Sequence, residues 1–135
     1  MEKFYVGGFL YNPVTKSILL HKRDNNTKIN PNMWAFFGGL NEGDETPKET
    51  FIRELKEELN IDVSSDRVRE LCNYFNEDLQ THRFVFFVES DLEKSQMKLG
   101  EGAGFDWIPL VEIFNYNLTE KTKIDLELFL QKYGQ

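Results

Sequence analysis

The chain has 135 residues, a formal net charge of −7 and 40% hydrophobic residues, including twelve phenylalanines. This length and composition predict one domain over residues 1–135 with a core of its own. The negative charge disfavours attraction to a nucleic-acid polymer. The N-terminus carries no signal segment and no apolar run approaches the roughly 18 residues of a membrane span, so we expect a cytoplasmic protein without membrane contacts.

Three strands are predicted in the first part of the chain. They are bounded by the turn residues Asn12 and Pro13 and by a polar stretch over residues 24–32. The third strand leads directly into Gly38 and Gly39. The predicted strands cover residues 4–11, 17–23 and 34–37.

A helix is predicted from Pro47 to Asn60. Thr46 can cap its N-terminus, proline suits the first helical position, and Glu49 can complete a capping box. Asn60 tolerates the left-handed conformation in which many helices end. At about 100° per residue, one face of this helix is apolar and suits a core. That face comprises Phe51, Ile52, Leu55 and Leu59.

The polar face of this helix concentrates acidic side chains beside one arginine. Like charges four residues apart, as in Glu54 and Glu58, cost roughly 0.2–0.5 kcal/mol on an isolated helix, so something must offset their repulsion. Mg²⁺ and Mn²⁺ bind through a few carboxylates together with substrate phosphates, so this face predicts a divalent-metal site. Without its flanking residues it would also be typical of a solvated acidic helix. The face comprises Arg53, Glu54, Glu57 and Glu58.

The second half of the chain is predicted to add three strands and a final helix. Both long helices carry apolar stripes that need a sheet face, so the predicted class is α/β, with helices flanking a mixed sheet. The strands cover residues 68–75, 82–89 and 105–108, a turn of helix lies near residues 110–114, and the final helix covers residues 119–133.

The spacing of the acidic residues resembles the signature of the Nudix family. The family box reads G-x5-E-x7-R-E-U-x-E-E-x-G-U, where U is aliphatic, and it falls on residues 39–61. The single departure is Asn60 in place of glycine, and both residue types tolerate positive φ. The matching residues are Gly39, Glu45, Arg53, Glu54, Leu55, Glu57, Glu58 and Ile61.

This resemblance implies a Nudix-type α/β/α sandwich and a site for Mg²⁺ or Mn²⁺. The implied metal ligands are the carbonyl of Gly38 and the carboxylates of Glu54, Glu57 and Glu58. The residues implied to hold these ligands in place are Glu45 and Arg53.

A second match lies outside the box. Residues 101–107 have the E-G-x-x-x-D-W spacing and resemble the MutT-type nucleoside triphosphate pyrophosphohydrolases of the family. This resemblance implies that Glu101 joins the metal cluster from a mobile loop. The glycines between Gly100 and Gly104 suit a hinge, so we expect the loop to close on substrate. Either Glu54 or Glu101 is expected to act as the general base.

The predicted substrate-binding residues are Arg23, Phe37 and Gly39. Arg23 ends the second strand, where similar MutT-type proteins hold phosphates with an arginine. Phe37 is one of three neighbouring aromatics, with Trp34 and Phe36, that could stack on a base. Gly39, like Gly38, would let the backbone come close to the metal.

These features predict a Mg²⁺-dependent, MutT-like pyrophosphohydrolase that cleaves the diphosphate bond of a nucleoside di- or triphosphate derivative. The (d)NTPs and their oxidised forms are candidate substrates. ADP-ribose and nucleotide sugars stay open, because no purine-reading asparagine follows Trp107 at the MutT-type spacing. A monomer and a homodimer also both stay open.

Two other classes share the predicted fold. An isomerase of the isopentenyl-diphosphate type relies on a catalytic cysteine and a longer chain, whereas Cys72 lies outside the box and is expected to be a packed thiol. A nucleotide-sensing module would usually have a damaged box or an attached DNA-binding segment. Every box carboxylate is present here, which favours hydrolysis.

Overall fold

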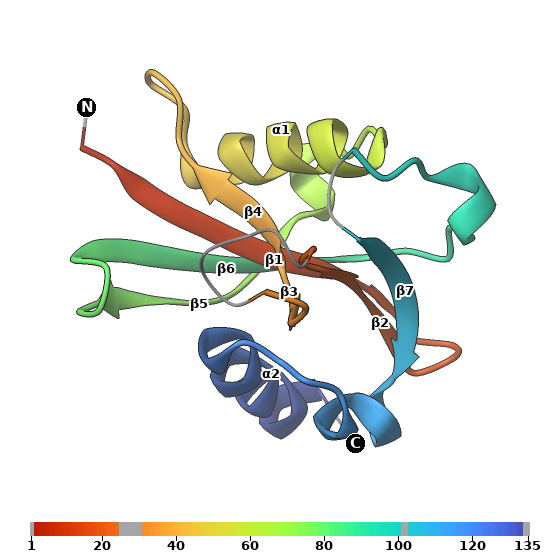
Figure 1. The fold of residues 1–135 in the computed structure, drawn as a ribbon. Coiled ribbons are helices and arrows are strands. Elements are labelled where there is room, and N and C mark those ends of the chain that lie inside the picture. Colours follow the sequence, from red (N-terminus) through yellow and green to blue (C-terminus); the bar gives the residue numbers. More distant parts are fainter. Residues whose placement is uncertain (1, 25–30, 101–102, 134–135) are drawn as a thin grey trace.

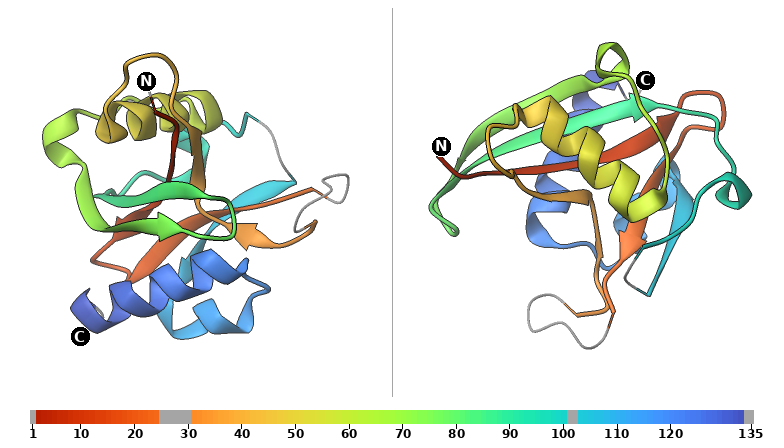
Figure 2. Two further views of the ribbon diagram at one scale, coloured as in Figure 1. Left: turned by 90° about the vertical axis from the view of Figure 1, so that its left-hand side faces the viewer. Right: turned by 90° about the horizontal axis from the view of Figure 1, so that it is seen from above.

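The computed structural model describes residues 2–24, 31–100 and 103–133. Within these ranges seven strands form one sheet, and helices α1 and α2 cover its opposite faces (Figures 1 and 2). The strands are β1 (Phe4–Asn12), β2 (Ser17–Lys22), β3 (Trp34–Ala35), β4 (Phe37–Leu40), β5 (Arg69–Asn76), β6 (Thr81–Glu89) and β7 (Gly104–Pro109). The helices are α1 (Pro47–Leu59) and α2 (Glu120–Tyr133), with short 3₁₀ helices η1 (Ser65–Arg67), η2 (Lys94–Gln96) and η3 (Leu110–Asn115).

Strand β1 is the centre of this sheet. It pairs in parallel with β6 along residues 4–11. Its other edge pairs antiparallel with β4 through residues 5–8 and then with β2 through residues 10–12. The sheet is therefore mixed, which confirms the predicted α/β class, and β1 changes partner near Phe9.

Residues 34–40 pass through the place where β1 changes partner. Strand β3 pairs with the end of β2, whereas β4 pairs with the start of β1, and Phe36 lies between them. The prediction of one strand over residues 34–37 is therefore wrong. The edge of β1 offers backbone hydrogen-bond partners that draw Gly38 and Gly39 into β4, and a side-chain pattern does not record such partners.

The core lies on both faces of the sheet. Alternate residues of β1 point to opposite faces, so Val6 packs toward α1 and Phe9 packs toward α2. On the α1 side the fully buried helix residues are Phe51, Leu55 and Leu59, and on the α2 side they are Leu126 and Phe129. The apolar stripes of both helices thus cover the sheet as their spacing predicted.

Helix α1 begins and ends as its sequence predicts. The Thr46 hydroxyl accepts from the N–H of Glu49 at 3.2 Å, and the Glu49 carboxylate accepts from the N–H of Thr46 at 2.8 Å. These two bonds form a capping box and satisfy N–H groups that the first turn leaves unpaired. Asn60 ends the helix with φ of 56°, so it adopts the left-handed conformation that the family's glycine would adopt.

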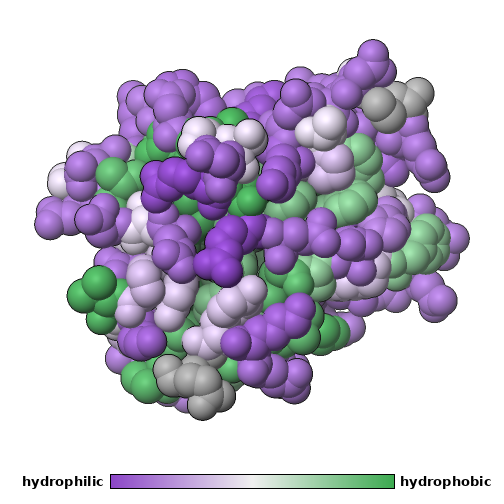
Figure 3. All heavy atoms as spheres, turned by 180° about the vertical axis from the view of Figure 1, so that it is seen from behind, coloured by the Kyte–Doolittle hydropathy of each residue, from purple (hydrophilic) through white to green (hydrophobic). Residues whose placement is uncertain are grey.

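The other predicted elements agree with the structure to within one or two residues at their ends. The short 3₁₀ helices η1 and η2 were not expected, because three residues are too few to carry a helical periodicity. No helix among the described residues is long and apolar enough to cross a membrane. The face seen in Figure 3 is mostly hydrophilic, with hydrophobic atoms showing in small areas between polar ones.

We expect Thr46→Ala to lower the free energy of unfolding by about 1 kcal/mol, because the N–H of Glu49 would lose its acceptor. The measurement is urea unfolding followed by circular dichroism. Lys48→Ala, an exposed change in the same turn, is the matched control and should stay within about 0.5 kcal/mol of the original protein. Equal effects of the two changes would contradict a stabilising cap at Thr46.

Candidate active site

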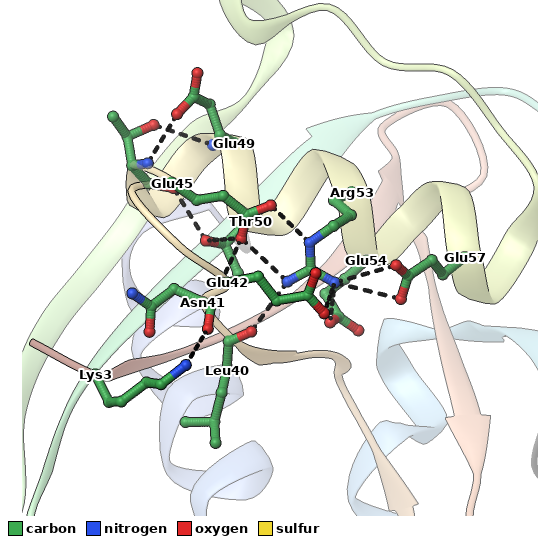
Figure 4. Close-up of polar contacts among 11 residues, drawn as sticks. Lys3, Leu40, Asn41, Glu42, Glu45, Glu49, Thr50, Arg53, Glu54 and Glu57 are labelled. Atoms are coloured by element: carbon green, nitrogen blue, oxygen red, sulfur yellow. Dashed lines mark hydrogen bonds and ion pairs between the residues drawn. The ribbon is translucent and has the colours of Figure 1, made fainter. Parts of the chain in front are cut away.

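One arginine side chain connects the loop before α1 with α1 itself (Figure 4). Arg53 Nε donates to Glu45 Oε2 at 2.6 Å, and Nη2 donates to Glu45 Oε1 at 3.1 Å and to the Leu40 carbonyl at 3.0 Å. Arg53 Nη1 donates to Glu54 at 2.9 Å and to Glu57 at 3.2 Å. The Arg53 side chain is only 19% exposed, so its bidentate contact with Glu45 is more stable than an ordinary surface ion pair.

Glu45 is fixed at both carboxylate oxygens. Its Oε1 also accepts from the N–H of Glu42 at 2.9 Å and from the hydroxyl of Thr50 at 3.0 Å. The hydrogen bonds from Arg53 are the main reason that the pKa of the Glu45 carboxyl falls to about 2. Glu45 is therefore ionised at neutral pH, and its hydrogen bonds with Arg53 in turn raise the pKa of Arg53.

The glycine pair brings β4 against two of the acidic residues. A Cβ atom at Gly39 would come within 2.7 Å of Glu54 Oε2, so a larger residue there would displace that carboxylate. The N–H of Gly38 donates to Glu58 Oε2 at 3.0 Å. Gly38 has φ of 154°, and a Cβ there would lie 1.9 Å from the Val6 carbonyl oxygen, so this position also requires glycine.

The acidic residues of α1 lie around these contacts in two groups. Glu54 and Glu57 are paired with Arg53, whereas Glu58 points to the N–H of Gly38. No three His, Cys, Asp or Glu side chains of the described ranges lie close enough together to hold a metal ion. Arg53 supplies the positive charge that offsets the repulsion between Glu54 and Glu57.

The chemistry of these donors nevertheless fits a divalent cation. Carboxylate oxygens from one helical turn and a nearby backbone carbonyl are the hard ligands that Mg²⁺ and Mn²⁺ take. The Glu57 side chain is 55% exposed, so its carboxylate can turn to a new partner without opening the core. Arg53 would keep its contacts with Glu45 and Leu40 if Glu54 and Glu57 changed partner.

The predicted ligand Glu101 lies outside the described residues. Its neighbour Gly100 donates its N–H to the Glu58 carbonyl at 2.8 Å. A Cβ at Gly100 would lie 2.5 Å from the Glu57 carbonyl oxygen, so glycine allows the chain to touch the end of α1. The chain therefore enters the E-G-x-x-x-D-W segment beside the turn that carries Glu57 and Glu58.

A cleft of about 520 Å³ opens beside this acidic turn. Its lining includes Gly38 and Glu58, the start of α2, and the turn between β5 and β6. Its described ionisable side chains include three that carry positive charge and three that carry negative charge. They are Arg23, Arg83 and Lys121, and Glu58, Asp78 and Glu120.

The predicted substrate-binding residues fall in different places. Arg23 lines the cleft, and Gly39 does not but lies one residue beyond Gly38, which does. Phe37 is fully buried in the core on the α1 side, where its ring lies 5.1 Å from that of His21. The structure thus places Phe37 away from the cleft, because neighbouring residues of an extended chain point to opposite faces of the sheet and Phe36 takes the cleft side.

A buried polar group in the cleft was not anticipated from the sequence. Arg83 Nε donates to Asp125 Oδ2 at 3.0 Å, and the Tyr74 hydroxyl donates to Asp125 Oδ1 at 2.8 Å. Burial raises the pKa of the Asp125 carboxyl, and the charge of Arg83 opposes that rise. No sequence pattern signalled this group, because Asp125 is 42 or more residues from its two partners and the three belong to no motif.

Cys72 lies near the same aspartate, with 4.0 Å between its sulfur and Asp125 Oδ1. Burial is the main cause that raises the pKa of the Cys72 thiol to about 11. The thiol is therefore protonated at neutral pH and suits the packed role that the sequence predicted.

His21 shows how burial affects a titrating group of the cleft wall. Its Nε2 lies 3.0 Å from the Phe36 carbonyl oxygen, and since a carbonyl only accepts, Nε2 carries the proton of the neutral ring. Burial lowers the pKa of His21 to about 4. At pH values between about 4 and the ordinary histidine pKa, His21 is therefore neutral in the folded protein but binds a proton in the unfolded chain.

We expect acidification to destabilise the protein more than a His21→Gln variant. Between pH 6.5 and about 4 the unfolded state binds a proton at His21 that the folded state does not, so the free energy of unfolding falls as the pH falls through this window. The measurement is the melting temperature of both proteins from pH 7.5 to pH 4. A difference between the two proteins that stays constant with pH would contradict a neutral, buried His21.

Comparisons with known proteins point to one family. A family model described as NUDIX domain matches residues 1–131. Among curated proteins, the dihydroneopterin triphosphate diphosphatase of Haemophilus influenzae is 39% identical over 57 residues. That match covers 42% of this chain and 34% of the relative, so the chain matches about a third of the relative's length.

Solved structures share the fold over nearly the whole chain. A MutT structure from work on Aliivibrio salmonicida and Vibrio cholerae has a TM-score of 0.78 and 22% identity, with 97% of this chain and 99% of that chain covered. The NUDIX domain of Shewanella oneidensis NrtR, solved with ADP ribose, has a TM-score of 0.77 and 15% identity, with 98% and 88% covered. At these identities the likeness concerns the fold, and it confirms the predicted sandwich.

Proposed function

Because this chain belongs to the Nudix family, we propose that it is a pyrophosphohydrolase that uses a divalent metal to cleave the diphosphate bond of a nucleoside di- or triphosphate derivative. The observation that carries this proposal is the acidic turn of α1, which carries three of the box carboxylates, Glu54, Glu57 and Glu58, while Glu45 holds Arg53 from the loop before the helix. Glu54 and Glu57 meet at Arg53, and Glu58 lies beside Gly38 at the mouth of a cleft.

The reaction places clear demands on the protein. The phosphorus atoms of a diphosphate are shielded by negative oxygens, so attack by water needs neutralisation of charge and a fixed geometry. Bound Mg²⁺ or Mn²⁺ would supply that neutralisation and lower the pKa of a water. The side chains that would hold the metal are Glu54, Glu57 and Glu58, with the Gly38 carbonyl and Glu101 as further ligands.

The other box residues would act by positioning. Arg53 and Glu45 fix each other through two hydrogen bonds, and Arg53 also holds the Leu40 carbonyl. This contact keeps β4 and the loop after it close to α1, and hence Gly38 and Gly39 close to the acidic turn. Either Glu54 or Glu101 would accept the proton of the attacking water.

The substrate is proposed to be a small molecule that lies in the cleft with its diphosphate at the Glu58 end. Arg23 lines the cleft and would contact phosphate. A nucleoside triphosphate or a related triphosphate is favoured by the E-G-x-x-x-D-W segment and by the curated relative, which acts on dihydroneopterin triphosphate. ADP-ribose or a nucleotide sugar is the alternative, and a domain of this fold has been solved with ADP ribose.

We expect Glu57→Gln and Glu58→Gln to lower kcat by about 10²–10³-fold or more, because each removes a charged metal ligand while keeping the shape of the side chain. The assay is phosphate or diphosphate release from a nucleotide panel with Mg²⁺. Mn²⁺ binding measured by electron paramagnetic resonance gives a second readout that does not depend on turnover, and it should weaken in both variants.

The matched control is Glu49→Gln on the same helix. Glu49 only caps the helix, and glutamine can replace it in a capping box, so activity should stay close to that of the original protein. Full activity of Glu57→Gln or Glu58→Gln would refute the proposed metal site. Tight nucleotide binding without hydrolysis by the unmodified protein would instead support a sensing module.

A further inference from the structure

The wall of the cleft that β5 and β6 form carries two largely buried hydrogen-bond donors. Arg83 on β6 is 7% exposed and Asn76 on β5 is 4% exposed, and both line the cleft. Tyr74 pairs with Arg83 across the two strands, and Asn76 lies two residues beyond Tyr74. Asn76 and Arg83 are therefore diagonal neighbours on one face of the sheet, a spacing that long side chains bridge.

The contacts of Arg83 with Asp125 use two of its three guanidinium nitrogens. Its Nε and Nη2 both lie 3.0 Å from Asp125 Oδ2, and Asp125 is held from its other side by the Tyr74 hydroxyl. Nη1 makes no hydrogen bond to any residue in the described ranges. Since Arg83 is paired with Asp125, its charge is already balanced, and its remaining donor suits a neutral acceptor better than a phosphate.

Asn76 is also oriented by its own contacts. Its Oδ1 accepts from the N–H of Asp78 at 3.1 Å, which fixes the amide so that Nδ2 is the group left over. Within the part of the chain that the structure describes, Nδ2 has no hydrogen-bond partner.

The two free donors open into the cleft. Every fully enclosed side-chain nitrogen or oxygen of the described residues has a hydrogen-bond partner, so Arg83 Nη1 and Asn76 Nδ2 must reach the open space that their side chains line. Largely buried donors are usually hydrogen-bonded in proteins, so a ligand with matching acceptors would satisfy both of them. Two such donors on one wall therefore indicate a ligand with two acceptors.

The surroundings of these donors suit a flat ring. The Arg83 guanidinium lies 5.5 Å from the centre of the Tyr5 ring and 5.9 Å from that of Phe36, and both rings line the cleft. A Cβ at Gly7 would lie 3.3 Å from Arg83 Nη2, so glycine leaves the guanidinium its place. Aromatic walls beside fixed donors are typical of sites that bind a heterocycle by its edge.

We propose that Arg83 and Asn76 are specificity residues that bind the acceptor edge of the substrate's ring, a carbonyl oxygen next to a ring nitrogen acceptor. Guanine offers this pair in O6 and N7, and a dihydropterin offers it in its 4-carbonyl and N5. Adenine has an amino donor in place of the carbonyl, and 8-oxoguanine has a hydrogen on N7. Each of these rings would therefore place an N–H group against a donor of Arg83 or Asn76, where no hydrogen bond can form. The inference rests on the proposed function and adds to it the class of ring that is preferred.

The first experiment changes atoms of the substrate and leaves the protein unmodified. We expect kcat/KM for dGTP or dihydroneopterin triphosphate to exceed that for dATP by about 10- to 100-fold. 7-Deaza-dGTP, which lacks N7, and 8-oxo-dGTP should both be cleaved less efficiently than dGTP. Of dGTP and dihydroneopterin triphosphate, the one with the higher kcat/KM shows whether the preferred ring is a guanine or a dihydropterin. Equal or better cleavage of dATP, or no penalty for 7-deaza-dGTP when dGTP is the better ring, would overturn the inference.

Binding of the products separates this inference from the proposed function. Calorimetric titration with dGMP, dAMP and dihydroneopterin monophosphate needs no turnover, so it decides the ring preference even for a protein that hydrolyses nothing. Hydrolysis without ring preference leaves the proposed function standing and refutes the role of Arg83 and Asn76. Ring preference in binding without hydrolysis refutes the proposed function and supports the role of Arg83 and Asn76.

A donor-to-acceptor change in the protein tests the same contact from the other side. Asn76→Asp keeps the oxygen that accepts from Asp78 but replaces Nδ2 with an acceptor, so the ratio of kcat/KM for dGTP over dATP should fall by about tenfold or more. Asn73→Asp on the same strand is the matched control, because Asn73 is outside the cleft and bonds to Glu70. An unchanged ratio in Asn76→Asp would contradict the assignment.

Arg83 is tested together with its partner, because removing it alone would leave the Asp125 charge buried. In the double variant Arg83→Met/Asp125→Asn, the amide oxygen introduced at position 125 can still accept from the Tyr74 hydroxyl. The ratio of kcat/KM for dGTP over dATP should fall by about tenfold or more in this variant. A purely structural ion pair would instead lower stability and leave the dGTP to dATP ratio unchanged.

Discussion

Arg53 and Glu45 are eight residues apart in the sequence and are joined by two guanidinium–carboxylate hydrogen bonds of 2.6 and 3.1 Å. The same guanidinium reaches the Leu40 carbonyl at the end of β4. One side chain of α1 therefore fixes both ends of the loop between β4 and the helix. Because guanidinium and carboxylate match in shape and charge, this contact tolerates little rotation. It therefore sets the distance between β4, which carries Gly38 and Gly39, and the acidic turn of α1.

The position of β4 in turn depends on how the sheet and α1 pack together. Gly38 and Gly39 can lie where they do because β1 leaves its first residues free to pair with β4 and then turns to β2. A Cβ at Gly8 on β1 would lie 2.6 Å from the Phe51 ring, so glycine at this position leaves room for Phe51 of α1. The position of the acidic turn is thus decided jointly by packing beneath α1 and by the Arg53 contact above it.

The residues that line the cleft come from separate elements. Glu58 lies on α1 within the family box, and Gly38 lies one residue before the box. Arg83 and Asn76 lie on β6 and β5 and are held by α2 and the neighbouring turn. Under the proposed roles, cleavage and recognition would fall on separate elements, so one could change in a relative while the other stays the same.

Much of this protein was determined by local sequence. The capping box at Thr46, the helix end at Asn60 and the apolar stripe of α1 each depend on residues within one or two turns, and spacing alone predicted them. The register of Glu45, Arg53 and the acidic residues also followed from spacing. Only the tertiary structure decided that Phe36 faces the cleft while Phe37 is buried on the α1 side, and that Arg83 meets Asp125. These contacts join strands and helices distant in the chain, and a sequence pattern holds no record of which distant side chains will share a face once the sheet has formed.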